Sequence, residues 1–184
     1  QSEAMSFQVA SDGLYSQYSW DSNIAKILGT LHRAIADLEL SVPEKDQVVF
    51  AAGEVYSFFR ELNKVIDSAE KFIFIIDPYL DSSVFDHYLN SRKSQVKVRL
   101  LLSRNGENVK AAFQKYLSQL GNVVEVRKSE KIHDRVIFID GYVGWVVGQS
   151  LKDAAKAKPT YLLPIAPDVI TSKLDVYEAI WNDA

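Results

Sequence analysis

The spacing of apolar residues along the chain predicts alternating helices and strands. Residues 21–38 repeat apolar positions at intervals of three and four, which is typical of an amphipathic helix. The same spacing predicts further helices at 54–69, 82–91, 107–120 and 168–183. Compact apolar runs bounded by turn residues predict strands at 48–53, 71–77, 96–102, 123–128, 133–139, 143–149 and 160–165. Residues 1–20 show no clear period, so we expect an irregular arm there.

This alternation is typical of an α/β protein. Strands that are apolar throughout must be covered on both faces, which predicts an α/β/α sandwich with a central mixed sheet. The strands on either side of Asp140 must pair antiparallel, because the two residues that follow it are too few for a parallel crossover. We expect residues 1–45 to form an N-terminal arm and helix, and residues 46–184 to form the folded domain.

The composition is that of an ordinary globular protein. It is 47% hydrophobic and 24% charged with a net charge of −3, which neither supports nor excludes a nucleic-acid binder, since such a protein needs only a local basic patch. No run suggests a transmembrane segment, and the start does not resemble a signal peptide. The absence of cysteine excludes disulfides and thiolate zinc sites; it suits our expected cytoplasmic location and is compatible with export. The start QSEAMSF leaves open that the chain is part of a larger protein.

The segment HDRVIFID carries the strongest chemical signal. His133 and Arg135 are two residues apart, so on a strand their side chains share a face. A guanidinium binds phosphate oxygens in a bidentate fork, and an imidazole attacks phosphorus or transfers a proton. A lone histidine is more often structural, but its neighbours favour a phosphate site. Asp140 has the opposite strand parity, so it reaches this site only if the strand has ended or bulged; otherwise it supports the fold.

Two other segments are candidates for the same site. Gln149 ends a predicted strand, and Ser150 and Lys152 follow it, where backbone N–H groups and a lysine suit an oxyanion; the alternative is a solvated surface turn. Asp77 and Tyr79 come after another strand, where an α/β sheet opens its crevice. Asp77 could instead cap the turn that follows it, and we leave both interpretations open.

These segments together resemble the phospholipase D superfamily, whose motif is His-x-Lys-x4-Asp followed by a Gly-Ser-x-Asn-type turn. The chain has His133-Asp134-Arg135, then Asp140, and later Gly148-Gln149-Ser150-Leu151. More narrowly, IDPYL, IHDR, GQSLKD and KPTYL look like segments of small bacterial proteins in this superfamily. The chain departs from the motif in having arginine for lysine, and Gln149 and Leu151 where serine and asparagine are usual. The resemblance covers residues 46–184 and implies a phospholipase D-like domain.

The resemblance implies a metal-independent phosphodiesterase without a cofactor, most plausibly a nuclease. His133 would be the nucleophile that forms a phosphohistidine, or the acid; Arg135 would hold the phosphate, and Asp140 would take the place of the motif's aspartate. Neither His32 nor His87 begins a second motif, so we expect a homodimer that brings two copies of one site together. The alternatives are a degenerate module that binds nucleic acid or another phosphate-bearing ligand, and an interaction domain of a larger bacterial system. The sequence does not distinguish DNA, RNA, lipid or nucleotide as the substrate.

Overall fold

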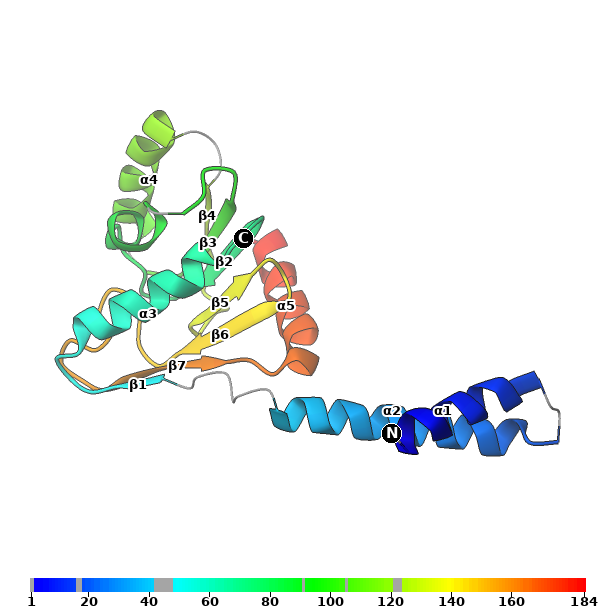
Figure 1. Ribbon diagram of the computed structural model, residues 1–184. Coiled ribbons are helices and arrows are strands. Elements are labelled where there is room, and N and C mark those ends of the chain that lie inside the picture. Colours follow the sequence, from blue (N-terminus) through cyan, green and yellow to red (C-terminus); the bar gives the residue numbers. More distant parts are fainter. Residues whose placement is uncertain (1, 16–17, 42–47, 91, 105, 121–123) are drawn as a thin grey trace. The chain divides into compact units, whose positions relative to one another are not determined.

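The chain forms two compact units, Gln1–Lys45 and Asp46–Ala184. The computed structural model in Figure 1 describes residues 2–15, 18–41, 48–90, 92–104, 106–120 and 124–184. None of the helices in these ranges is both long enough and apolar enough to span a membrane.

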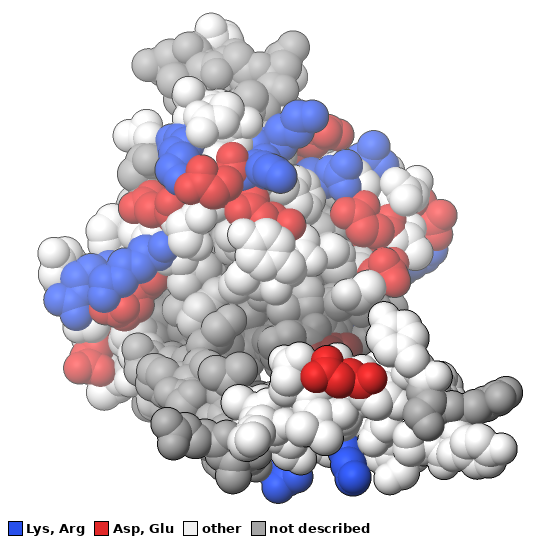
Figure 2. Space-filling view, turned by 45° about the vertical axis from the view of Figure 1, so that its right-hand side comes forward, with Lys and Arg blue, Asp and Glu red and all other residues white. Residues whose placement is uncertain are grey.

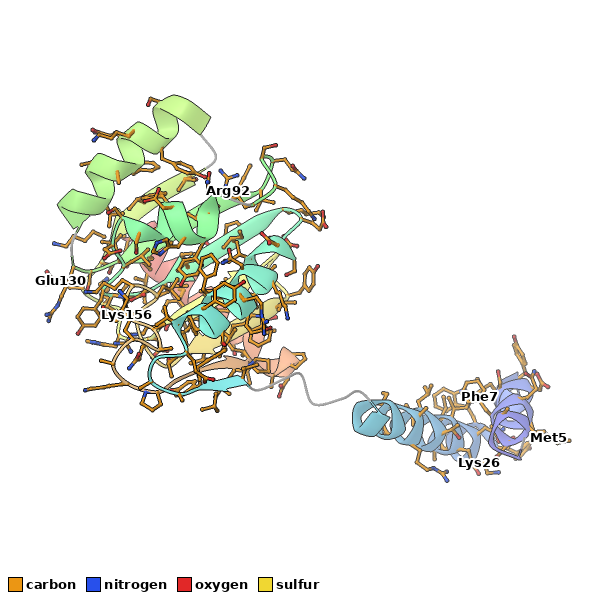
Figure 3. All side chains as sticks on the ribbon, turned by 60° about the vertical axis from the view of Figure 1, so that its left-hand side comes forward. Met5, Phe7, Lys26, Arg92, Glu130 and Lys156 are labelled. Atoms are coloured by element: carbon orange, nitrogen blue, oxygen red, sulfur yellow. The ribbon has the colours of Figure 1, made fainter. Side chains whose placement is uncertain are left out.

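The first unit is a pair of helices with a short turn. Its elements are α1 (Ser2–Asp12), the 3-10 turn η1 (Gly13–Tyr15) and α2 (Trp20–Ser41). The expectation of an irregular arm is therefore wrong for residues 2–12. Asn23 of α2 holds the pair together, because its side-chain amide donates to the Gly13 carbonyl at 2.9 Å, and Ala10 of α1 is buried. The apolar residues of α1, such as the exposed Met5 in Figure 3, do not follow a helical period, so the pattern gave no signal.

The second unit is built on a seven-stranded sheet. Its strands are β1 (Val48–Phe50), β2 (Phe72–Ile76), β3 (Lys97–Leu102), β4 (Val124–Lys128), β5 (Val136–Ile139), β6 (Val143–Val147) and β7 (Thr160–Pro164). Their order is β1-β7-β6-β5-β2-β3-β4. The strands β2, β3 and β4 run parallel, and every other pairing is antiparallel, including β5 against β2 with Phe138 opposite Phe74. The predicted mixed sheet is confirmed, as is the antiparallel pairing around Asp140.

Helices cover both faces of this sheet (Figure 1). They are α3 (Val55–Asp67), the π-helix η2 (Phe85–Leu89), α4 (Gly106–Leu120) and α5 (Pro167–Asn182). Alternate residues of β2 separate the two cores: Ile73 and Ile75 pack with α3, η2 and α4, whereas Phe74 and Ile76 pack with α5. Phe74 meets Trp181 edge-on, with the ring centroids 5.4 Å apart. The α/β/α sandwich is therefore confirmed, and both faces of its central strands are buried.

One edge of the sheet gathers the chemically interesting segments. Because β5 runs antiparallel to β2, the residues before β5 lie beside the residues after β2. The parallel neighbour β3 ends at the same edge, and so does β6. Segments 77–79, 103–104, 130–135 and 148–152 therefore meet there although they are distant in sequence. Among the described residues in view in Figure 2, acidic and basic side chains are interspersed.

Candidate active site

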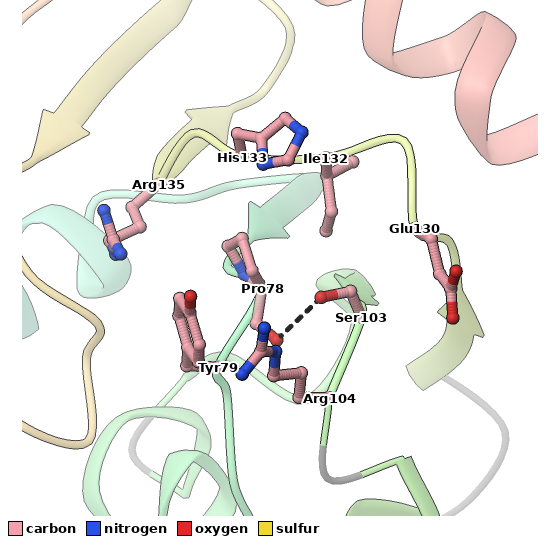
Figure 4. A pocket seen from close by; sticks show the side chains of 8 residues that line it. All are labelled: Pro78, Tyr79, Ser103, Arg104, Glu130, Ile132, His133 and Arg135. Carbon is pink, nitrogen blue, oxygen red and sulfur yellow. Dashed lines mark hydrogen bonds between the residues drawn. The ribbon is translucent and has the colours of Figure 1, made fainter.

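A pocket of about 320 Å³ opens at this edge of the sheet (Figure 4). Three segments contribute the residues that line it: Pro78 and Tyr79 after β2, Ser103 and Arg104 after β3, and Glu130, Ile132, His133 and Arg135 before β5. The pocket therefore contains His133 and Arg135 together, as the spacing of the motif predicted. Among the described lining residues there are two arginines and a histidine but one carboxylate, that of Glu130, and this balance favours an anionic ligand.

The segment that carries His133 and Arg135 is extended chain rather than strand. The strand β5 begins at Val136, so the expected strand start at residue 133 is wrong, and strand parity is not the reason that the two side chains share a pocket. The buried side chain of Ile132 fixes the segment on one side, and the Arg135 carbonyl accepts the Val147 N–H at 2.9 Å on the other. The His133 side chain is exposed at the mouth of the pocket.

Two guanidinium groups contact one aromatic ring inside the pocket. The Cζ atoms of Arg104 and Arg135 lie 5.1 Å and 5.5 Å from the ring centroid of Tyr79, within the range of cation–π attraction. The Nε atom of Arg135 is buried without a hydrogen-bond partner among the described residues. A buried donor without a partner costs roughly 1–3 kcal/mol, so a ligand oxygen that accepts from this arginine would be stabilised.

Sequence reasoning missed Ser103 and Arg104. Both follow the apolar run 97–102, and a signal was present: the carboxyl ends of parallel strands meet at the same edge of a sheet. The Arg104 N–H donates to the Pro78 carbonyl at 2.8 Å, which fixes the two strand ends to each other. Arg104 thus enters the pocket through the pairing of β3 with β2, which the sequence alone did not establish.

Asp134 anchors the motif to helix α5. Its carboxylate accepts from the Lys173 ammonium at 2.8 Å and from the Tyr177 hydroxyl at 2.7 Å. These two hydrogen bonds, the lysine's first, hold the pKa of the Asp134 carboxyl below its ordinary value. Burial, and then the bond to Asp134, raise the pKa of Tyr177. The residue between His133 and Arg135 therefore holds the segment against a rigid element.

Asp77 connects the end of β2 to the turn after β6. It is 1% exposed, and its carboxylate accepts from the Tyr79 N–H at 3.0 Å and from the Ser150 hydroxyl and the Leu151 N–H, both at 2.8 Å. Burial raises the pKa of the Asp77 carboxyl, while these hydrogen bonds and the charge of Arg135 oppose the shift. The structure thus supports the capping interpretation of Asp77, and it places Tyr79 on the pocket wall.

The structure does not bring the turn after β6 into the His133 pocket. The hydroxyl of Ser150 is buried and bound to Asp77, and the Gln149 Oε1 atom is buried without a partner among the described residues. Lys152 lines a different cavity, and its ammonium lies 3.3 Å from the Asp153 carboxylate. The expectation that these residues bind the phosphate at His133 is therefore not met by the geometry of a single chain.

Asp140 supports the fold at the opposite end of β5. It has a positive φ of 53°, and its carboxylate accepts the N–H groups of Glu70, Lys71 and Phe72 at 2.9, 2.7 and 2.8 Å. Partial burial works to raise the pKa of the Asp140 carboxyl, but the three N–H groups outweigh it and the pKa is lowered. The four residues of β5 separate Asp140 from the pocket, and its three contacts support the second of the two interpretations, in which it stabilises the fold.

Metal ligands do not cluster in the described parts of the chain. Within them, no group of three or more His, Cys, Asp or Glu side chains is placed to hold a metal ion. The chemistry that the pocket itself offers is that of an imidazole beside two guanidiniums.

Several solved structures have a similar fold. The chain resembles Nuc from Salmonella typhimurium, a phospholipase D family member, at 18% identity over 74% of this chain and 94% of that one, with a TM-score of 0.56. NucT from Helicobacter pylori matches at 16% identity over 74% and 96%, with a TM-score of 0.57. TrmBL2, an archaeal chromatin protein, matches at 16% identity over 91% of this chain and 66% of its own, with a TM-score of 0.53.

No family model matches the sequence, and no curated protein matches it. The likeness is therefore one of fold, and it extends over nearly the whole length of the two bacterial structures. The chain has the fold of the phospholipase D superfamily.

Proposed function

We propose that this protein is a metal-independent phosphodiesterase that cleaves nucleic acid, with residues 46–184 as its phospholipase D-like domain and residues 1–45 as an N-terminal arm. One observation carries the proposal: His133 and Arg135 line one pocket with Arg104, and the buried Nε of Arg135 has no partner among the described residues. The fold, shared with Nuc from Salmonella typhimurium and NucT from Helicobacter pylori, adds support.

The proposed reaction has two steps. A neutral His133 imidazole attacks phosphorus, and the bond to the leaving oxygen breaks as a second, protonated imidazole gives that oxygen its proton. Water then attacks the phosphohistidine, gives its proton to the second imidazole, and releases the phosphate monoester with the first imidazole restored. Arg135 and Arg104, whose guanidiniums both contact the Tyr79 ring, stabilise the charge that develops on the non-bridging oxygens.

A second copy of the chain would supply the second imidazole. His133 is the one histidine among the described residues that line the pocket, and it lies exposed at the mouth. A two-fold axis beside the mouth would place the same patch opposite itself, so two chains would share one phosphate site. The two imidazoles would then titrate as a coupled pair, one neutral and one protonated at the working pH.

The test uses bis-p-nitrophenyl phosphate and single-stranded DNA. We expect His133→Ala to abolish cleavage of both, EDTA to leave cleavage unchanged, and Arg135→Lys to keep or raise the rate, because lysine is the usual residue of the motif that this chain resembles. The matched control is His32→Ala, which changes an exposed histidine of α2. Full activity in His133→Ala, or loss of activity with EDTA, would refute the mechanism.

A binding module is the second candidate. Two observations favour it: arginine stands where the motif has lysine, and the Ser150 hydroxyl is bound to Asp77 instead of facing the pocket. Such a module would bind nucleic acid or another phosphate-bearing ligand at Arg104 and Arg135 without turnover. A folded wild-type protein that binds an oligonucleotide saturably, loses this binding in Arg135→Ala and cleaves neither substrate would establish it.

A further inference from the structure

A second cavity, of about 360 Å³, lies between α3, η2 and the turn after β6. The residues that line it include Tyr56, Phe59, His87, Leu151, Lys152 and Lys156. Its wall is aromatic: the rings of Tyr56 and Phe59 are stacked at 26° with centroids 6.4 Å apart, and His87 meets Phe59 edge-on at 86°. The Tyr56 side chain is 73% exposed, so this wall offers a flat aromatic face to a ligand. The volume is in the range of small-ligand sites.

The groove has basic side chains on one side and acidic side chains beyond the other. Lys152 and Lys156 stand on the side of the 150–158 turn, where Lys156 is exposed (Figure 3). The adjoining hollow beyond Phe59 is lined by Asp67 and Asp86 instead. The ion pair of Lys152 with Asp153 is partly exposed and therefore weak, so a phosphate can compete for this ammonium. An anion is favoured at the lysine side and disfavoured at the other.

The groove is a neighbour of the His133 pocket. Leu151 lines the groove, and its N–H is bound to the Asp77 carboxylate. Tyr79, two residues after Asp77, lines the His133 pocket. One hydrogen bond and two residues of chain therefore connect a wall residue of the groove with a wall residue of the His133 pocket.

We infer that the groove binds one nucleotide unit of a single-stranded nucleic acid, and that this is the strand that would be cleaved at His133. The base stacks on Tyr56 and Phe59, and the adjoining phosphate lies at Lys156 and Lys152. Stacking platforms beside cations are the means by which proteins hold single strands without reading their sequence, since every base has an aromatic face. A duplex would leave no base face free for such stacking. The inference rests on the proposed function and names its substrate class.

Fluorescence anisotropy of a fluorescein-labelled oligo-dT tests the groove, with His133→Ala protein so that nothing is cleaved. We expect Tyr56→Ala to weaken binding about 5- to 100-fold, the range for removing one stacked base contact. Lys156→Ala should reduce the slope of log affinity against log salt by about 0.7, the value for one phosphate contact on a single strand. An abasic oligomer should bind Tyr56→Ala and its parent equally.

The matched controls lie at the opposite edge of the sheet. Tyr142→Ala removes a tyrosine that is 68% exposed in the β5–β6 turn, and Lys97→Ala removes an exposed lysine at the start of β3; both should bind like the parent. Unchanged affinity and salt slope in the groove variants would overturn the inference and leave the groove to a protein partner. Displacement of the oligomer by thymidine monophosphate as readily as by unlabelled oligo-dT would also overturn it, in favour of a free nucleotide.

Hydrolysis of bis-p-nitrophenyl phosphate separates this inference from the proposed function, because that substrate has no nucleobase and no second phosphate. If oligonucleotide binding depends on Tyr56 but the protein does not hydrolyse this substrate, the proposed nucleotide site in the groove stands and the proposed phosphodiesterase activity is refuted. Hydrolysis that depends on His133, with normal oligonucleotide binding in Tyr56→Ala, would preserve the enzyme and refute the groove.

Discussion

Three aspartates hold the segments that carry the candidate site. Asp77 ties the end of β2 to the turn after β6, Asp134 ties the His133 segment to α5, and Asp140 ties the end of β5 to the residues before β2. Each accepts two or more hydrogen bonds, and none lines the pocket. At the scale of single residues, the motif therefore contains two kinds of side chain: those that line the pocket and those that hold the backbone in place.

Replacing Asp140 should destabilise the fold in a pH-dependent way. Asp140→Asn removes the charge that three N–H groups share, so we expect a loss of about 2–3 kcal/mol in the free energy of unfolding at pH 7. The folded pKa lies below the ordinary value of 3.8, so this stability is present above that value and is lost as the pH falls through the folded pKa.

Urea unfolding at pH 7 and at successively lower pH measures the effect of Asp140→Asn. The difference between wild type and variant should narrow below about pH 4. Asp175→Asn, at an exposed aspartate of α5, is the control and should change little. An equally small effect of Asp140→Asn at pH 7 would show that the three hydrogen bonds do not stabilise the fold.

The sequence predicted these residue roles only in part. Strand parity gave two alternatives for Asp140, and the structure selects the structural one because β5 continues regularly as far as Ile139. For Asp77 the sequence left two interpretations, a cap of the following turn or a residue of the site. Its contacts with the N–H groups of Tyr79 and Leu151 favour the cap. The Tyr79 N–H is close to Asp77 in sequence, but the other deciding donors, Leu151 for Asp77 and residues 70–72 for Asp140, are some seventy residues away, where no local pattern contains them.

At the scale of elements, α5 is the support of the pocket. Tyr177 and Lys173 of this helix reach across to Asp134, while Ile170 and Trp181 pack in the core beneath β2 and β5. The helix therefore connects the core packing with the position of His133. A nucleophile must be held in line with phosphorus, and a displacement of about 1 Å can reduce a rate 100-fold.

Tyr177→Phe should reduce catalysis more than stability. It removes one hydrogen bond to Asp134, so we expect a loss of roughly 1 kcal/mol in unfolding free energy, together with a fall in kcat of up to about 100-fold and a nearly unchanged KM. Kinetics on bis-p-nitrophenyl phosphate measure this split. Tyr142→Phe is the control, since that exposed tyrosine lies in the β5–β6 turn. A rise in KM with kcat preserved would assign Tyr177 a different role.

Most elements were predicted from the sequence, and the exceptions have physical causes. Residues 2–12 form a helix because they pack on α2, not because of their own pattern. The strand expected from residue 133 begins at Val136 instead, and the buried Ile132 belongs to the extended segment before it. The π-helix η2 lies within the short helix expected at 82–91, so a helix was predicted there but its π-type hydrogen bonding was not.

At the scale of the whole molecule, strand order created the site. The sequence indicated that strands alternate with helices, but not that β5 inserts beside β2, which is more than sixty positions earlier in the chain. That pairing places His133 next to Tyr79, and the β2–β3 pairing adds Arg104. Local patterns therefore predicted the motif, whereas the remaining pocket residues follow from long-range pairings that no local pattern encodes.

The open mouth of the pocket leads to the prediction that two chains form one active site. If each site needs a His133 imidazole from both chains, a dimer with one His133→Ala chain has a nucleophile or an acid but not both, and it is inactive. When the two forms are co-expressed in equal amounts and pair at random, only a quarter of the dimers hold two imidazoles.

Specific activity should therefore follow the square of the wild-type fraction, measured on bis-p-nitrophenyl phosphate over a series of mixtures. Light scattering should give twice the mass of one chain for wild type and for His133→Ala alike, because the substitution removes a group at the pocket mouth and not a core side chain. The control series mixes wild type with His32→Ala and should stay constant. A linear dependence on the wild-type fraction would mean that each chain contains a complete site, and the acid would then have to come from the same pocket, where Glu130 is the one carboxylate among the described lining residues.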